Sequence, residues 1–185
     1  EKKHLDATLS ALNWAEKNHK LPMGLVSGEE WLAGTGSTRN VETCNVAAGP
    51  WTLYWLMQIT GNRQYGDQAE KIFFNAGPVP ISRNFQTMCY YQSPNRISMN
   101  FPEDEPAHPG NDSYVYSETG HEVLCCVGNS NRIIPNYITN MWMETSDRGL
   151  AATLYGPSRV KTNINGKSLI IKSSTDYPFE ENIQM

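Results

Sequence analysis

The chain has 185 residues, of which 39% are hydrophobic and 10% aromatic, so it is long enough to bury the core of an ordinary domain, and its composition is not that of a disordered protein. Its 19 acidic and 15 basic side chains leave a formal charge of −4 without any basic run, which argues against nucleic acid as a partner. No apolar stretch approaches the roughly 20 residues of a membrane-spanning helix, which argues against a membrane partner, and the polar N-terminus lacks a signal-peptide core.

Helical periodicity dominates the first 80 residues. Leucines at helical spacing predict an amphipathic helix over residues 5–18. Residues 21–40 are rich in glycine, serine and threonine and keep no period, which indicates a long loop of the kind that often carries function. Apolar residues over 43–60 and 65–76 predict two further helices. The turn between them is so short that they must pack antiparallel, as a helical hairpin.

The pattern changes in the second half of the chain. Short extended runs occupy the region around residues 85–100, and residues 130–144 return to helical spacing. Beyond residue 147 the residues alternate, and Asn165-Gly166 is a strong two-residue hairpin turn. We therefore expect a boundary near Arg148 between a helical part and a β part.

Cys125 and Cys126 are adjacent, and adjacent cysteines rarely bond to each other because the small ring distorts the peptide between them. Together with Cys44 and a carboxylate two residues before it, Glu42, they form a set of three thiols and one oxygen ligand that suits tetrahedral zinc. Two alternatives stay open. All four cysteines could be inert core residues, which is the interpretation we favour for Cys89, and Glu42 could stabilise the first turn of the helix that begins near residue 43.

Six segments in this order carry a resemblance to a known family: SGEEWLAG, VETCNVA, ITGNRQYGDQAEKIFFNA, YYQSPNR, LCCVGNSNR and LAATLYGPS. Together they resemble the bacterial β-L-arabinofuranosidases of glycoside hydrolase family 127 and its relatives, over about residues 22–158.

The resemblance implies a mainly α fold in which residues 1–147 are part of an (α/α) six-hairpin helical barrel, the catalytic domain, and residues 148–185 start a β-sandwich domain. The family's barrel needs further helices upstream, so we expect the chain to be a fragment of a longer protein. An unclosed barrel would expose an apolar face and favour association of copies into a homo-oligomer.

The resemblance also implies the site residues. Zinc would be held by Glu42, Cys44, Cys125 and Cys126, with Cys125 as the nucleophile. The general acid/base would be Glu30, twelve residues before Glu42, with Glu29 as the alternative carboxylate. Three further residues are candidates for sugar binding: Tyr90, Asn95 and His121.

The implied chemistry is coherent, because zinc ligation deprotonates a thiol and a thiolate can replace the usual nucleophilic carboxylate of a retaining glycosidase. We expect removal of β-L-arabinofuranosyl residues from plant-type, arabinose-containing glycans, with the isolated chain inactive. Two alternatives are another sugar specificity and a non-catalytic carbohydrate-binding or scaffold protein with structural zinc. The family's role favours a periplasmic or secreted location and leaves a cytoplasmic one open.

The five tryptophans of the chain are further candidates for carbohydrate binding. Trp31 and Trp51 could stack on sugar rings, although we favour core packing for Trp51, Trp55 and Trp142.

Overall fold

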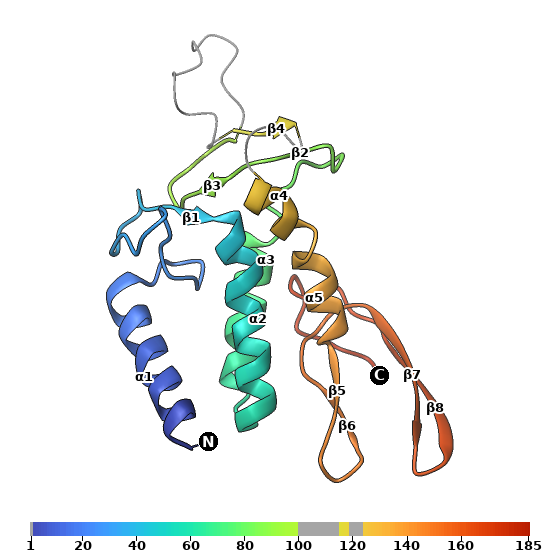
Figure 1. The fold of residues 1–185 in the computed structure, drawn as a ribbon. Helices are drawn as coiled ribbons and strands as arrows, with labels where there is room; N and C mark the ends of the chain where they lie inside the picture. The colour runs from blue at the N-terminus through green and yellow to red at the C-terminus, as the bar shows by residue number, and fades with distance from the viewer. Residues whose placement is uncertain (1, 100–114, 119–123) are drawn as a thin grey trace.

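The computed structural model describes residues 2–99, 115–118 and 124–185 (Figure 1). In chain order its elements are α1 (Lys2–His19), β1 (Val41–Glu42), α2 (Thr43–Thr60), α3 (Gln64–Ala76), β2 (Thr87–Met88), β3 (Tyr91–Gln92), β4 (Ser117–Glu118), α4 (Leu124–Ser130), α5 (Ile133–Thr139), β5 (Trp142–Glu144), β6 (Leu150–Ala152), β7 (Ser158–Ile164) and β8 (Lys167–Ser173). The fold is mainly helical with small sheets, as predicted.

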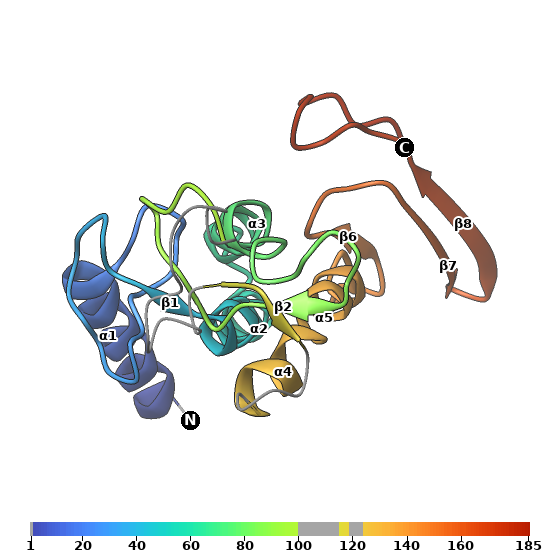
Figure 2. The ribbon, with the colours of Figure 1, turned by 90° about the horizontal axis from the view of Figure 1, so that it is seen from above.

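The centre of the fold is the antiparallel hairpin of α2 and α3, which Figure 2 shows side by side. Helix α2 ends because Gly61 adopts a left-handed conformation with φ 68° and donates its N–H to the carbonyl of Met57 at 2.8 Å. The hairpin buries Leu53 and Ile72, and each such side chain contributes about 1.5–3 kcal/mol by leaving water. The predicted helical hairpin is confirmed.

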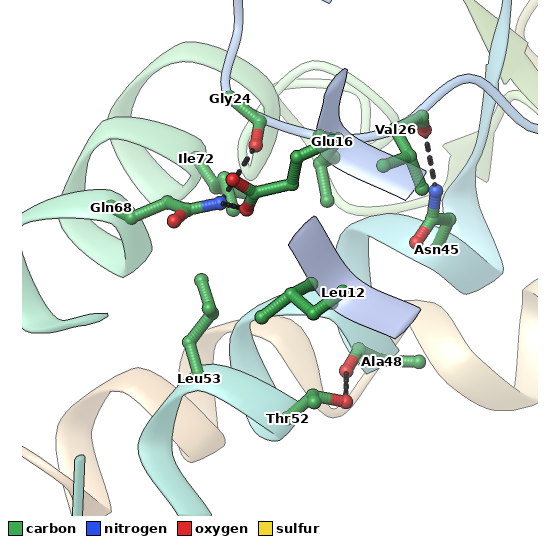
Figure 3. A pocket seen from close by; sticks show the side chains of 12 residues that line it. Leu12, Glu16, Gly24, Val26, Asn45, Ala48, Thr52, Leu53, Gln68 and Ile72 are labelled. Atoms are coloured by element: carbon green, nitrogen blue, oxygen red, sulfur yellow. Dashed lines mark hydrogen bonds between the residues drawn. The ribbon is translucent and has the colours of Figure 1, made fainter. Parts of the chain in front are cut away.

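Helix α1 lies beside this hairpin and has no fully buried residue. Figure 2 shows it to one side of the pair formed by α2 and α3. A cavity of about 220 Å³ lies between α1 and the hairpin, with Leu12 and Leu53 among its walls (Figure 3). At one side Gln68 of α3 donates its amide N–H to the Glu16 carboxylate and to the carbonyl of Gly24. The walls of this cavity include no cysteine.

The strands form four two-stranded antiparallel sheets, β1 with β3, β2 with β4, β5 with β6 and β7 with β8. In the β7–β8 turn, Asn165 and Gly166 have φ 52° and 80°, as expected for a type I′ turn, so this hairpin is confirmed. The helical interpretation of residues 130–144 is wrong beyond Thr139. Residues 142–144 pair instead with residues 150–152, because a hairpin partner outweighs the local helical spacing.

The predicted boundary near Arg148 falls in the turn between β5 and β6, where the Arg148 N–H donates to the carbonyl of Thr145 at 2.9 Å. The division into residues 1–147 and 148–185 remains a prediction. The described residues contain one α-hairpin and no closed barrel. None of the described helices combines the length and the apolar character that crossing a bilayer requires.

The core-packing prediction is wrong for two tryptophans. Trp51 and Trp55 are 45% and 52% exposed, on the same face of α2 as the exposed Ile59, because α2 turns its opposite faces toward α3 and the preceding loop. Trp142 is half-buried against the core, as predicted.

One buried carboxylate ties the helical part to the chain that follows it. Glu70 of α3, 6% exposed, accepts hydrogen bonds from the Tyr137 hydroxyl at 3.3 Å, the Tyr177 hydroxyl at 2.7 Å and the backbone N–H of Tyr155. Burial raises the pKa of Glu70 above its usual value, and the three donors only partly oppose that shift. The fold therefore favours the protonated form of this group more than the unfolded chain does.

The raised pKa of Glu70 predicts a pH dependence of stability. The unfolded group titrates near 4.3, so its stabilising contribution is complete below that pH and is lost as pH rises through the higher folded pKa. In urea unfolding from pH 4 to 8, the stability of the wild type relative to Glu70→Gln should therefore fall as pH rises. The exposed Glu144→Gln is the control, and a pH-independent difference for Glu70→Gln would contradict the prediction.

Candidate active site

The start of α2 is fixed against the segment that contains Cys89 and Tyr90. Thr43, fully buried, donates its hydroxyl to the carbonyl of Cys89 at 2.7 Å and its backbone N–H to the carbonyl of Tyr90 at 2.8 Å. Just before it, Glu42 of β1 is paired with Tyr91 of β3. These contacts bring Cys44, in the first turn of α2, to the same end of the molecule as Tyr90.

Helix α4 packs against the same end of α2 and brings the adjacent cysteines to Cys44 (Figures 1 and 2). The Sγ atoms of Cys44, Cys125 and Cys126 all lie within 4.8 Å of one another, and the first and last are 3.2 Å apart. All are free thiols. The structure thus brings together three predicted sulfur ligands that are separated by some 80 positions in the sequence.

Burial raises the pKa of Cys44 and, more strongly, that of Cys126, which is fully buried. For Cys44 a hydrogen bond from the Asn129 side chain opposes this shift. A buried thiol stays protonated unless a nearby cation compensates for the loss of water. The cluster is therefore a place where a soft cation would find sulfur ligands that gain by binding it.

Tyr90 connects the cluster to Glu30. Its hydroxyl donates to the Glu30 carboxylate and accepts from the Cys125 thiol, with a distance of 3.8 Å between Sγ and the phenol oxygen. Burial, followed by the contact with Glu30, raises the pKa of Tyr90, so the phenol keeps its proton. The two predicted catalytic residues, Glu30 and Cys125, are thus linked through a single hydroxyl group.

Glu42 stands next to this group without joining the three sulfurs. Its Oε1 accepts the backbone N–H of Glu30 at 2.9 Å, and it makes no side-chain cap to α2. The set of ligand atoms that lie mutually within 4.8 Å contains the three cysteines alone among the described residues. Burial raises the pKa of Glu42, opposed by that hydrogen bond. Its role as a fourth ligand remains a prediction.

The neighbouring carboxylate, Glu29, faces elsewhere. Its Oε1 accepts the backbone N–H of Asn40 at 3.0 Å and the side-chain amide of Asn40 at 3.1 Å, while its Oε2 lies 3.7 Å from the Arg39 guanidinium. Glu29 therefore ties the middle of the long loop to its last two residues, and Glu30 is the carboxylate that contacts Tyr90.

The remaining predicted residues lie apart or outside the description. Asn95 is exposed, and its backbone N–H donates to the carbonyl of Ser37 at 3.1 Å. His121 lies outside the described residues. Cys89 is fully buried, and burial raises its pKa to about 12, in keeping with an inert core residue.

Two contacting residues escaped the sequence analysis. Asn129 donates a side-chain N–H to Cys44 Sγ at 3.1 Å, and Arg132 donates to the Asn129 carbonyl oxygen. Asn129 lies four residues after Cys125 on the same face of α4, and Arg132 lies in the turn between α4 and α5. The sequence analysis did not predict α4, which has seven residues, so this spacing could not be recognised.

A pocket of about 330 Å³ opens beside Glu30 and Glu42. The exposed indole of Trp31 and the side chain of Asn45 are part of its lining. An aromatic wall with amide and carboxylate groups suits a sugar ring, which offers both C–H faces and hydroxyl groups.

Comparison with solved structures defines the class of fold. The chain matches a glycoside hydrolase with a TM-score of 0.62 and 23% identity over 80% of this chain and 23% of the other. It also matches a GH127 β-arabinofuranosidase (TM-score 0.68, 15% identity, 90% and 25% covered) and a GH127 β-L-arabinofuranosidase from Geobacillus stearothermophilus T6 (TM-score 0.66, 19% identity, 90% and 27% covered). At these identities the likeness establishes the fold.

The family follows from the sequence of residues 28–139, which matches the model of the β-L-arabinofuranosidase GH127 catalytic domain. The chain belongs to this family, as the resemblance had indicated. It spans about a quarter of the length of the solved structures that it matches. No curated protein matches it.

The different burial of the cysteines predicts their order of alkylation. Cys125 is exposed and Cys89 is fully buried, so in metal-free protein iodoacetamide should modify Cys125 first and Cys89 last. Peptide mass spectrometry over a time course measures the order, with urea-unfolded protein as the control in which the preference disappears. Modification of Cys89 as fast as that of Cys125 would contradict the described packing.

Proposed function

We propose that this chain carries the nucleophile, the acid/base and the zinc ligands of a retaining glycosidase that removes β-L-arabinofuranosyl residues from plant-type glycans. Membership of the GH127 family supports a glycosidase. The observation that carries the proposal is the link from Glu30 through the Tyr90 hydroxyl to Cys125.

That link supports a retaining reaction through the distance it implies. Retaining glycosidases hold nucleophile and acid/base roughly 5–5.5 Å apart, whereas inverting ones leave a wider gap for water. A single phenol oxygen that contacts both groups keeps them near each other, which supports the shorter, retaining separation. This proximity supports the proposed pairing of Cys125 as the nucleophile with Glu30 as the acid/base.

The cluster suits zinc by its donor set. Sulfur ligands of tetrahedral zinc lie about 3.8 Å apart, given a Zn–S bond of about 2.3 Å, and the three Sγ atoms are already within 4.8 Å of one another. Cys44, Cys125 and Cys126 would hold the ion, with Glu42 as the fourth ligand. When bound, zinc would keep these thiols deprotonated and so supply a nucleophilic sulfur at neutral pH.

The residues of the chain would then act in two steps. In the first, the Cys125 sulfur attacks the anomeric carbon, the bond to the leaving oxygen breaks, and Glu30 gives that oxygen its proton. In the second, Glu30 takes a proton from water, the water oxygen attacks the same carbon, and the sulfur leaves as a thiolate. Tyr90, which stays protonated, would orient the Glu30 carboxylate between the steps.

The sugar would lie in the pocket beside Glu30, against Trp31. Asn95 and His121 remain proposed sugar contacts. Because the chain spans about a quarter of its solved relatives, we propose that it works as a section of a longer enzyme and that alone it is inactive. A periplasmic or secreted location and association of copies belong to the same proposal.

The matched pair Glu30→Gln and Glu29→Gln tests the acid/base, in a polypeptide that supplies the rest of the enzyme. Loss of general acid/base catalysis costs about 10²- to 10⁴-fold, so Glu30→Gln should lower kcat on an aryl β-L-arabinofuranoside by that order. Glu29→Gln should lower it much less, because Glu29 braces the loop. A larger loss in Glu29→Gln would assign the role to Glu29, and activity of the isolated chain would overturn its proposed dependence on further sequence.

Zinc content and the substitution Cys125→Ser test the nucleophile. Elemental mass spectrometry of protein purified without added metal or chelator should find about one zinc per chain. In a polypeptide that supplies the rest of the enzyme, Cys125→Ser should lose turnover and keep its fold, because Cys125 is exposed and supports no core packing. Loss of the fold together with the metal would favour a structural zinc in a non-catalytic protein.

A further inference from the structure

Three side chains next to the cysteine cluster contact one another in a line that begins at Cys44. Asn129 of α4 donates its side-chain N–H to Cys44 Sγ at 3.1 Å, and its carbonyl oxygen accepts from Arg132. The Arg132 guanidinium lies over the indole of Trp51, with 5.6 Å from Cζ to the ring centroid. Trp51 and Cys44 are both on α2, so the line starts and ends on that helix.

The line fixes which end of the Asn129 amide meets the sulfur. A guanidinium has donors and no acceptor, so Arg132 must face the amide oxygen, and the NH₂ group is left for Cys44. An N–H directed at sulfur requires a sulfur lone pair. The arrangement therefore directs a donor at the Cys44 sulfur from a fixed side, and this fixes the direction from which one of its lone pairs is used.

Among the described residues, Arg132 in this position leaves one of its own N–H donors without a hydrogen bond. Its Nε is buried and has no partner within the part of the chain that the structure describes. Buried donors are rarely left unpaired, and those that are call for an explanation beyond packing. The stacking on Trp51 also explains why an exposed tryptophan lies at this position of α2.

We propose that Asn129 is a positioning residue for the metal centre, which orients the Cys44 sulfur through its N–H and is itself oriented by Arg132 on Trp51. This inference rests on the proposed function, since it requires that the cluster bind a metal. Residues that hydrogen-bond to metal ligands typically change metal affinity 10- to 100-fold when replaced.

The test compares the same substitution at two asparagines. Leucine is close to asparagine in size and has no donor, so Asn129→Leu removes the N–H and keeps the volume. Asn131→Leu is the matched control, because Asn131 is exposed on the turn after α4. Zinc affinity of the full chain is measured by competition with a chromogenic chelator, and the folded state by circular dichroism. Asn129→Leu should bind zinc about 10- to 100-fold more weakly, and Asn131→Leu like the wild type.

The absorption spectrum of bound cobalt(II) gives a second measurement, which would not change if Asn129 had a purely structural role. In the cobalt-loaded chain the sulfur-to-metal charge-transfer band reports the energy of the sulfur lone pairs, which a hydrogen bond lowers. Asn129→Leu should therefore shift this band to longer wavelength. Arg132→Met, which frees the amide to turn over, should shift it in the same direction by a smaller amount.

The outcomes separate the two proposals. A wild-type chain without cobalt or zinc binding would overturn the proposed metal site and this inference with it. Normal binding by the wild type, with neither the affinity nor the band altered in Asn129→Leu, would overturn the role of Asn129 and leave the proposed function standing.

Discussion

The site depends on one buried residue at the junction of β1 and α2. Thr43 uses its hydroxyl and its backbone N–H to hold the carbonyls of Cys89 and Tyr90. Each such hydrogen bond contributes a net 0.5–1.5 kcal/mol or so, and loss of either would leave a buried polar group without a partner at greater cost. Tyr90 reaches Cys125 and Glu30 only while the chain around residues 89–91 stays against the start of α2. A threonine with no proposed chemical role thus holds Tyr90 where it contacts both candidate catalytic residues.

At two places in this protein, Glu70 and the cysteine cluster, burial disfavours the charged form of an ionisable group. The surroundings of the two groups differ. At Glu70, burial raises the pKa and three hydrogen-bond donors fix a carboxyl group that links α3 to Tyr155 and Tyr177. No chemistry is required there, and the three hydrogen bonds supply the partners that the buried carboxyl group needs. At the cysteine cluster, burial raises the pKa of Cys44 and Cys126, yet the Asn129 N–H faces a sulfur that must accept. Only the second arrangement gains from a cation, which separates a structural site from a candidate reactive one.

Local patterns predicted α1, α2 and α3 well, because periodicity and terminal residues such as Gly61 act over a few positions. The three sulfurs could be grouped by their chemistry and the family resemblance, although no local pattern links Cys44 to Cys126. The features that the sequence did not predict depend on contacts between segments that are far apart in the chain. Residues 142–144 follow a hairpin partner rather than their own helical spacing, and the outward face of Trp51 depends on which sides of α2 are already covered. The partnership of Asn129 with Cys44 needed both α4 and its packing on α2.

The choice between Glu29 and Glu30 shows how backbone conformation decides chemistry that composition leaves open. Glu30 has φ 65°, a left-handed conformation that costs a non-glycine residue about 1–2 kcal/mol. Its N–H donates to the Glu42 carboxylate, and a hydrogen bond to a charged group contributes about 1.5–3 kcal/mol, enough to offset that cost. The turn sends the two neighbouring carboxylates in different directions, Glu29 to Asn40 and Glu30 to Tyr90. The same Glu42 that is the candidate fourth ligand thereby holds the candidate acid/base in place, so a metal that drew Glu42 toward the sulfurs would also move the backbone of Glu30.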